Sequence, residues 1–491
     1  MSDNYIGRGQ SARARKRRRK IIIRRIIGIA VICILLGVLI FLVVKLINKN
    51  SEKDPTSPTF TEGPSEPSSQ DNPTEPTSPT EDTADVIVKA RKLASQYDYA
   101  GAIELLKSQP GFDQRQELTT LADEISQQEA ACVTVNAETI PHVFFHSLIV
   151  DFERCFDTSA HSSAVINGYN AWMVTDEEFS KIIQMLYDAN YVVLNISDVY
   201  KCSDGVYSPA TDIKLPSGKK PVIFSYDDTA YYAQYADLGL ADRMIIDENG
   251  DIRCEYTDRA GVTRVGNYDH VPILNDFVKL HPDFAYHNHK GTLALTGYDG
   301  VFGYRTDVGF FESPTSDEKA WLNAHPDITL DHISEYTEQA KVIANKLRED
   351  GYEFACHSWG HRPFSQKSVD WLKTDTEKWL SRVAPIVGDT DILVYPHGAD
   401  IAGLEKYTSE NEKYAYLSSK GFHTFFNVDA GGMYWYQYGG SYVRGARINI
   451  DGYLMYQTMI GNSSVLTKLG IDVNSVFDSR RPTPVIADGA G

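Results

Sequence analysis

The hydrophobic positions near the start of the chain form one unbroken apolar run, Ile26–Val44, directly after a basic block. Such a run is long enough to cross the hydrocarbon core of a bilayer, and basic residues before it keep the N-terminus on the cytoplasmic side. A cleavable signal peptide is the alternative, but the run exceeds an ordinary signal core and no small-x-small cleavage site follows it. We therefore predict a basic cytoplasmic tail (1–20) and one uncleaved transmembrane helix (21–48) of the cell membrane, with the rest of the chain outside.

The segment 49–84 is polar almost throughout and consists mainly of Ser, Thr, Pro, Glu and Asp. It has too little apolar surface to form a core, so we predict a disordered linker. Proline and like charges keep such a segment extended. The linker therefore carries the following regions away from the bilayer.

The segment 85–135 regains an apolar pattern with helical spacing. Residues 97–106 resemble one tetratricopeptide-like helix pair, but a stable array of such repeats needs at least three. We predict a short helical stalk, and partner binding by this segment is the alternative. The apolar positions that recur at helical spacing are Val86, Ala90, Leu93, Tyr97 and Ala100.

From about residue 136 the pattern alternates between strands and helices. Thr175–Glu178 is a capping box that opens an amphipathic helix, and the apolar run Tyr191–Ile196 follows as a strand. Such alternation indicates an α/β fold with a parallel sheet, and in a (β/α) barrel the chemistry lies where the strands end. We assign 136–475 to this domain and 476–491 to a C-terminal tail.

Charge supports this division of the chain. The net charge is −18, with 48 Lys and Arg against 66 Asp and Glu. The first 25 residues nevertheless hold a dense basic block, which is a pattern also seen in nucleic-acid-binding tails. Because the apolar run follows the block directly, we interpret it as a determinant of membrane orientation and expect no nucleic-acid partner.

Two adjacent carboxylates end a predicted buried strand. The apolar residues 222–224 are followed by Ser225, Tyr226, Asp227 and Asp228. Two carboxylates at this distance repel each other unless a cation or a shared proton offsets the repulsion. An exposed turn with solvated aspartates is the alternative, and the pair alone does not exclude it.

A second strand ends in two histidines. His357 and His361 have the i, i+4 spacing that brings two imidazoles to one face of a single turn. Together with Asp228 they form the ligand set of a catalytic zinc site, with three protein ligands and one open position. Asp227 then stands beside the reacting water as a base. Without the Asp pair, two unrelated histidines are the more common origin of this spacing.

These motifs resemble those of the polysaccharide deacetylases, the NodB homology domain of carbohydrate esterase family 4. Ser225–Thr229 and His357–His361 resemble the first two family motifs, Ile392–Gly398 the third, and Val143–Ser147 the opening strand. The resemblance covers roughly residues 140–470 and implies a distorted (β/α) barrel.

The resemblance also implies roles for individual residues. Asp228, His357 and His361 hold a divalent metal, with zinc favoured, which polarises the acetyl carbonyl and lowers the pKa of a bound water. Asp227 accepts a proton from that water, and the backbone N–H of His397 helps to hold the oxyanion. The catalytic residues implied are therefore Asp227 and His397.

The chain departs from the family pattern at two places. Many members have an arginine in the third motif that orients the base, and Val394 stands at that position here. The late Leu-x-His motif, which supplies the general acid, has no counterpart: 447–451 contains no histidine. Arg305 and Arg447 are secondary candidates for site residues, and the general acid is not identified.

The stretch 240–330 has no match to the common core, and we interpret it as an insertion with a hairpin at its Asn249-Gly250 turn. His287 and His289 could be ligands, although a solvated loop is favoured because no carboxylate partner is evident. The aromatic cluster 433–438 could stack on sugar rings or could equally pack against the barrel.

The sequence thus predicts a membrane-anchored, extracytoplasmic, metal-dependent polysaccharide N-deacetylase. Its expected partners are an N-acetylated cell-wall glycan and the membrane, with peptidoglycan as the first choice of substrate and a secreted exopolysaccharide as the second. Two alternatives remain open: a degenerate homologue that binds glycan without catalysis, and an esterase acting on O-acetyl groups.

Overall fold

The structure, a computed structural model, describes residues 82–429 and 432–487. The predicted basic tail, the transmembrane helix 21–48 and nearly all of the linker lie outside the described residues. Among the residues described, no helix combines the length and apolar character needed to span a membrane. The chain divides into two units, Met1–Ser78 and Pro79–Gly491, and the description below concerns the second unit.

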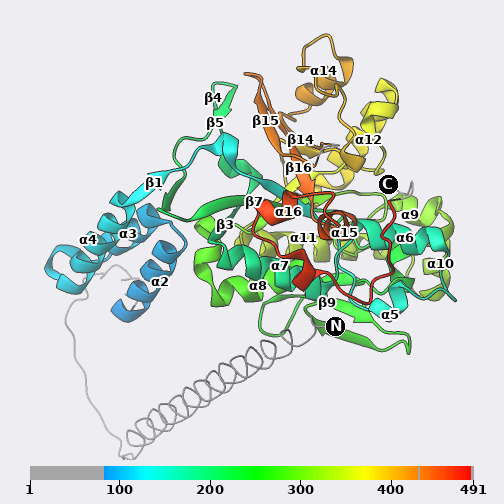
Figure 1. Cartoon of the computed structure of the whole chain (residues 1–491), viewed down its shortest axis with the longest axis horizontal. Coiled ribbons are helices and arrows are strands. Elements are labelled where there is room, and N and C mark those ends of the chain that lie inside the picture. The colour runs from blue at the N-terminus through cyan, green and yellow to red at the C-terminus, as the bar shows by residue number, and fades with distance from the viewer. Residues whose placement is uncertain (1–81, 430–431, 488–491) are drawn as a thin grey trace, which may run out of the picture. The chain divides into compact units, whose positions relative to one another are not determined.

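Three helices occupy the predicted stalk: α2 (Thr83–Ser95), α3 (Tyr99–Lys107) and α4 (Gln116–Ala130). The Asp82 and Asp98 side chains cap the first two helices, each accepting a hydrogen bond from a backbone N–H of the first turn. Figure 1 shows the three helices grouped beside β1 (Cys132–Thr134).

The helices are fixed to the rest of the unit by hydrogen bonds at the loop between α2 and α3. The N–H of His287 donates to the carbonyl of Gln96 at 2.7 Å, and the Tyr97 hydroxyl donates to the carbonyl of Asp283 at 2.8 Å. The helical segment is therefore docked against the α/β domain.

Seven parallel strands of the described residues close into a barrel, as the alternating pattern predicts. Each strand pairs in parallel with the next, and β11 pairs back onto β7 to complete the ring. Nearly all of their side chains are buried, which explains why they read as continuous apolar runs. In ring order the strands are β2 (His142–Phe145), β7 (Lys220–Asp227), β11 (Gly291–Leu295), β12 (Tyr352–Cys356), β13 (Ile392–Val394), β14 (Thr424–Val428) and β16 (Val443–Asn449).

Helices cover the outer face of the barrel (Figure 1). Ile343, Ala344 and Leu347 of α11 share one buried cluster with the outward side chains of the strands, such as Phe224 and Leu293. The main helices of the domain are α6 (Ser163–Trp172), α7 (Asp176–Asp188), α8 (His270–Leu280), α10 (Ser316–Ala324), α11 (Ile333–Glu349), α12 (Val369–Arg382), α14 (Glu412–Ser419) and α15 (Gly452–Met459), and shorter ones are α5 (Phe152–Cys155), α9 (Val308–Glu312), α13 (Ala384–Val387), α16 (Val465–Lys468) and α17 (Val473–Val476).

The barrel is distorted at two strands, each of which changes its partner strand partway along its length. The first half of β7 pairs with β3 (Tyr191–Leu194), and its second half pairs with β11. Likewise, the first half of β16 pairs antiparallel with β15 (Trp435–Tyr438), and its end pairs with β2. The ring therefore flares where the strands begin and narrows where they end.

The stretch 240–330 is an insertion only in part. It contains an antiparallel sheet of β8 (Arg243–Ile246), β9 (Ile252–Thr257) and β10 (Thr263–Gly266), and the predicted hairpin at Asn249-Gly250 joins the first two. It also contributes β11, a strand of the barrel itself. Two small antiparallel sheets lie elsewhere: β1 with β6 (Lys214–Pro216), and β4 (Tyr200–Ser203) with β5 (Val206–Pro209).

Candidate active site

The two aspartates at the end of β7 are buried, which is a correction to the alternative of an exposed turn. Side chains alternate along the strand, so Asp227 points to the same inner face as Ser225. Asp228 then takes a left-handed backbone conformation (φ 61°), and this turn brings the second carboxylate to the same place. The Tyr232 hydroxyl donates a hydrogen bond to Asp228 Oδ1 and lies 2.7 Å from the Thr296 hydroxyl.

The two histidines that follow β12 face this pair. His361 Nε2 lies 3.5 Å from Asp228 Oδ1, and His357 Nε2 lies 3.9 Å from the same oxygen. The ligand atoms of Asp228, His357 and His361 all lie within 4.8 Å of one another. The structure therefore brings the three predicted ligands together around one point.

The segment between the histidines is irregular rather than one turn of helix. Ser358 and His361 both have left-handed backbones (φ 60° and 48°), and the His361 N–H donates to the Ser358 hydroxyl at 2.9 Å. Asp375 of α12 accepts hydrogen bonds from the N–H groups of Trp359 and Gly360, both at 2.8 Å. The two imidazoles thus come together through an irregular loop, which the hydrogen bonds to Asp375 hold in place.

Hydrogen bonding fixes which nitrogen of His357 is available to a metal. Its Nδ1 lies 2.9 Å from the carbonyl of Val394, and because a carbonyl only accepts, Nδ1 carries the proton. The lone pair of Nε2 is then free toward the carboxylates. Burial also lowers the pKa of His357 to about 4 and that of His361 to about 3, so both rings are neutral at neutral pH.

The residues present fit a divalent metal. Two neutral imidazoles and one carboxylate form the donor set of catalytic zinc sites, in which three protein ligands leave one position open. The Val394 carbonyl behind His357 is the kind of outer partner that orients a metal-ligating ring.

Arg447 of β16 holds the other aspartate. Its Nη1 donates to Asp227 Oδ1 at 2.7 Å and its Nη2 to Oδ2 at 2.9 Å, and Nη1 also lies 3.1 Å from the Ser225 hydroxyl. Burial on its own would raise the pKa of Asp227, but the Arg447 guanidinium and His357 hold it well below the usual range. Asp227 is therefore ionised, and its two oxygens are fixed in direction.

Arg305, the other arginine candidate, lies elsewhere. Its Nη1 donates to the carbonyls of Tyr231 (2.8 Å) and Asp299 (3.2 Å), and its guanidinium lies 4.8 Å from the Trp321 ring centroid. It braces the loop that follows the aspartates and does not take the place beside Asp227.

His287 and His289 also lie apart from the metal ligands. The His289 Nδ1 is 2.8 Å from a carboxylate oxygen of Asp198, and the His287 ring stacks on Tyr286 at 4.0 Å between centroids. Both residues adjoin the docked helix α2, where the His287 N–H donates to Gln96.

The third-motif loop reaches the same place. His397 has a left-handed backbone (φ 55°), and its ring lies 4.5 Å from that of His361 between centroids. A side chain at Gly398 would meet Val428 Cβ at 2.5 Å, so only glycine allows the loop to pack here. His397 is exposed, and partial desolvation lowers the pKa of its ring.

His146 is a residue of the site that the sequence argument missed. It follows the end of β2, and its ring lies 5.5 Å from Phe144 between centroids. Its Nδ1 is buried and has no hydrogen-bond partner among the described residues. In the sequence, His146 directly follows the predicted opening strand. Its link to the site comes from strand pairing, which the sequence does not show: Phe144 of β2 pairs with Asn449 of β16.

The two aspartates and His146, His357, His361 and His397 line one cleft of about 630 Å³ at the end of the barrel where the strands finish. Asp227 and Asp228 form one side of it with His357, His361 and His397. Apart from the two aspartates, no acidic residue, lysine or arginine of the described chain lines this cleft. Much of the remaining lining is aromatic and consists of Phe144, Tyr169, Trp172, Tyr232, Tyr235 and Tyr298.

The aromatic cluster 433–438 does not line this cleft and packs against the barrel. The hydroxyls of Tyr434 and Tyr436 donate to the carbonyls of Thr139 and Ile140, at 3.1 and 2.7 Å. The aromatic surface of the cleft comes instead from β2, from α6 and from the loops after β7 and β11.

Comparisons with known proteins give little beyond the site itself. No protein family model matches the chain, and no curated protein matches it. Among solved structures, the chain is similar to a Streptococcus pyogenes deacetylase, PplD, in complex with acetate. The identity is 14%, the match covers 66% of this chain and 95% of that chain, and the TM-score is 0.33.

Proposed function

We propose that the protein is a metal-dependent hydrolase that removes acetyl groups from the amide nitrogen of an N-acetylated glycan. The observation that carries this proposal is the convergence of Asp228, His357 and His361 in a cleft with a largely aromatic lining. When bound there, a divalent ion supplies a Lewis acid for the acetyl carbonyl and a water of lowered pKa.

Asp227 is the base in this proposal. Its carboxylate lies 3.8 Å from His357 Nε2, beside the three ligands but held by Arg447. The bidentate contact keeps Asp227 ionised and aimed at the cleft, so that Oδ2 accepts a proton from the attacking water. Arg447 binds Asp227 and not Asp228, so the two neighbouring carboxylates have different roles: Asp227 is the base and Asp228 is a metal ligand.

His146 is the group that protonates the leaving amine. It follows the end of β2 and lines the cleft, and an imidazole can carry and release a proton, as a general acid must. Asn449 also lines the cleft and lies in 447–451, the segment that lacks the Leu-x-His motif. Its amide is not ionisable, so it cannot act as a general acid. The backbone N–H of His397 stabilises the oxyanion, in a loop whose left-handed residue turns it toward His361.

The cleft suits a sugar ring. Aromatic side chains offer flat apolar surfaces to the faces of such a ring. N-acetylated hexosamines fit this description. With the predicted anchor, peptidoglycan is the first choice of polymer and a secreted exopolysaccharide the second.

The degenerate, non-catalytic alternative rested on the missing arginine and the missing Leu-x-His. Arg447 and His146 supply both kinds of group from other strands, which favours catalysis. The test is acetate release from defined N-acetylglucosamine oligomers and from intact wall, with and without added metal. Metal-dependent acetate release with an equal yield of free amine is expected; release only from O-acetylated substrates, or no release at all, contradicts the proposal.

A further inference from the structure

One wall of the cleft is a single helix, α6, and it presents one face to the cleft. Ala164, Val165, Gly168, Tyr169 and Trp172 line the cleft, at positions that share one side of a helix. The opposite side, with Ile166, Asn170 and Ala171, is buried against the protein. The position of α6 therefore sets the position of Tyr169 and Trp172.

The last turn of α6 is fastened by Arg481, near the end of the described chain. Arg481 Nη1 donates to the carbonyl of Asn170 at 3.0 Å and to its Oδ1 at 2.9 Å, while Nη2 donates to the carbonyl of Met173 at 2.8 Å. These are backbone carbonyls at a helix C-terminus, which lack partners within the helix and favour a cation.

The same arginine is paired with Glu178 in the first turn of α7. Arg481 Nε donates to Oε1 at 2.7 Å and Nη2 to Oε2 at 2.6 Å, and both side chains are fully buried. With the bonds to Asn170 and Met173, all five N–H groups of the guanidinium have acceptors. Lysine, with three donors and no planar fork, cannot reproduce this set.

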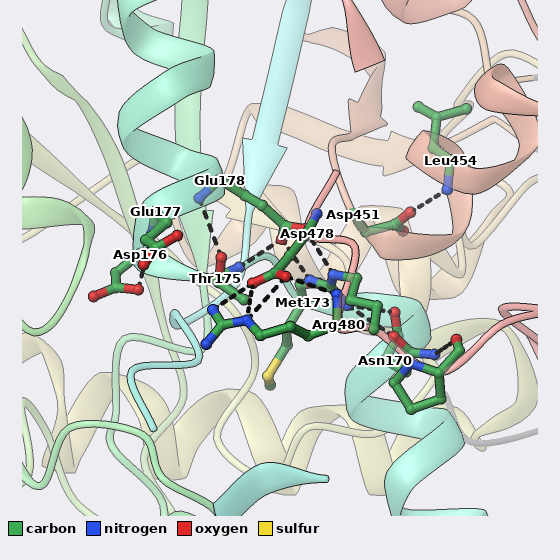
Figure 2. A network of polar contacts seen from close by, with 12 residues as sticks. Asn170, Met173, Thr175, Asp176, Glu177, Glu178, Asp451, Leu454, Asp478 and Arg480 are labelled. Atoms are coloured by element: carbon green, nitrogen blue, oxygen red, sulfur yellow. Dashed lines mark hydrogen bonds and ion pairs between the residues drawn. The ribbon is translucent and has the colours of Figure 1, made fainter. Parts of the chain in front are cut away.

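Glu178 joins this contact to the rest of the segment. Its carboxylate also accepts from the N–H of Thr175 and from the N–H of Asp478, both at 2.8 Å (Figure 2). Asn170 in turn donates to the carbonyl of Pro482 at 2.7 Å. The chain segment 478–482 thus bridges the end of α6 and the start of α7.

Close packing fixes the same helix end from another side. A Cβ at Gly452, the first residue of α15, would lie 2.0 Å from the carbonyl oxygen of Asn170 and 2.8 Å from Arg481 Nη1. Only glycine allows α15 to approach this closely. The end of α6 is therefore held by a hydrogen-bonded charge pair and by a backbone contact that excludes any side chain.

We propose that Arg481 is a positioning residue for glycan binding: through Asn170 and Glu178 it holds α6 so that Tyr169 and Trp172 form the wall on which the sugar ring lies. The inference rests on the proposed function, since it takes the aromatic wall as the sugar-binding side. Arg481 itself does not line the cleft, so it acts through α6 and not on the reacting atoms.

The experiment compares Arg481→Lys and Glu178→Gln with the matched control Arg480→Ala in the full chain. Arg480 is the neighbouring arginine: its half-exposed side chain pairs with Asp478 and, among the described residues, has no hydrogen bond or ion pair with α6. Binding of an N-acetylglucosamine tetramer is measured by calorimetry on an Asp227→Asn background, so that the ligand is not consumed. KM, kcat and metal content are measured without that background, and amide hydrogen exchange follows residues 163–172.

Both variants should bind the tetramer about tenfold more weakly, or weaker still, and raise KM by a similar factor, because small misplacements of a binding group are costly. We expect kcat and metal content to stay near the unmodified values, and amide exchange in α6 to become faster. Arg480→Ala should change none of these. Glu178→Gln keeps the shape of the side chain, so agreement between the two variants separates the charge pair from a local packing defect.

The inference is overturned if tetramer affinity and KM are unchanged in both variants, whatever the rate of amide exchange in α6. If the unmodified chain binds the tetramer but releases no acetate, the proposed function fails while the role of Arg481 is still judged by affinity. If it does not bind the tetramer at all, both fail.

Discussion

The two ends of the barrel both hold acidic and aromatic residues, but the carboxylates have different surroundings. Where the strands begin, Asp391 accepts hydrogen bonds from the hydroxyls of Tyr200 and Tyr207, both at 3.0 Å, and from Thr424 at 3.1 Å. All three donors to this carboxylate are hydroxyls of the protein itself. This network therefore stabilises the fold.

Where the strands finish, the polar groups face one another across a cleft. Asp228 lies 3.5 Å from His361 and 3.9 Å from His357, and the Nδ1 of His146 has no partner among the described residues. One carboxylate and two imidazoles that converge on one point in a cleft form the donor set of a metal site.

Left-handed backbone occurs at both ends. Where the strands begin, Asn190, His287 and Asn288 have positive φ, and Asn and His are among the residue types that adopt it most readily. Where the strands finish, Asp228, Ser358, His361 and His397 have it, and of these Ser358 is the type that adopts it least readily. The loops after β7, β12 and β13, which carry the site residues, therefore each turn through a left-handed residue.

The largest effect should come from removing the metal ligands. In the full chain, the double variant His357→Ala and His361→Ala should lose both its stoichiometric metal and its acetate release, because one carboxylate does not hold a zinc ion. Metal content by mass spectrometry and acetate by enzymatic assay measure this. Asp391→Asn serves as the control at the other end of the barrel and should retain its metal; a full metal content in the double variant would refute the site.

His146→Gln should give the next largest effect. Glutamine keeps a polar side chain of similar length but has no proton to transfer at neutral pH, so kcat should fall roughly 10²–10⁴-fold. Metal content should not change, since His146 lies outside the three ligands. Substrates with a good leaving group need less protonation and should be hydrolysed with a smaller loss. An equal loss on both kinds of substrate would argue against a general acid at this position.

Arg447→Lys should weaken catalysis through the base. Lysine keeps the charge but cannot contact both oxygens of Asp227, so orientation is lost and kcat should fall on the order of 10²-fold. Arg447 lowers the pKa of Asp227 against the effect of burial, so weakening the contact raises that pKa. Because the base must be ionised, the acid limb of the kcat/KM profile should then move to higher pH. An acid limb that stays in place would show that Asp227 is not the titrating base.

The smallest catalytic effect is expected from Asp391→Asn, at the end where the strands begin. The amide keeps the shape of the side chain but weakens the hydrogen bonds from the two tyrosines, which should cost about 1–3 kcal/mol of unfolding free energy. Chemical denaturation measures this loss. Because the network lies at the other end of the barrel from the cleft, kcat should stay within about twofold of the unmodified value. A large fall in kcat with unchanged stability would remove the contrast between the two ends.

The parts of this fold that depend on neighbouring residues could be predicted from the sequence. The Asp227-Asp228 pair and the His357 and His361 pair each follow an apolar strand directly, and the alternation of strands and helices indicates the barrel. What joins these pairs is the parallel pairing that brings strand ends to one edge.

The rest depends on contacts between distant strands. Arg447 lies 220 residues after the aspartate that it holds, and nothing local distinguishes it from Arg305. Its role follows only from the closure of the barrel, in which β16 lies beside β2 and β2 beside β7. His146 was overlooked for the same reason, and the loop of His357–His361 was expected to be a regular turn because left-handed backbone at Ser358 leaves no mark in the sequence.

The most direct test of the account compares two adjacent residues. Asp227→Asn keeps the shape and the three metal ligands but accepts no proton, so it should retain stoichiometric metal while turnover falls roughly 10²–10⁴-fold. Asp228→Asn should lose metal and turnover together. The measurement is metal content and acetate release on the same preparations of both variants. An Asp227→Asn variant with near-normal turnover, or one that loses its metal as completely as Asp228→Asn does, would contradict the account.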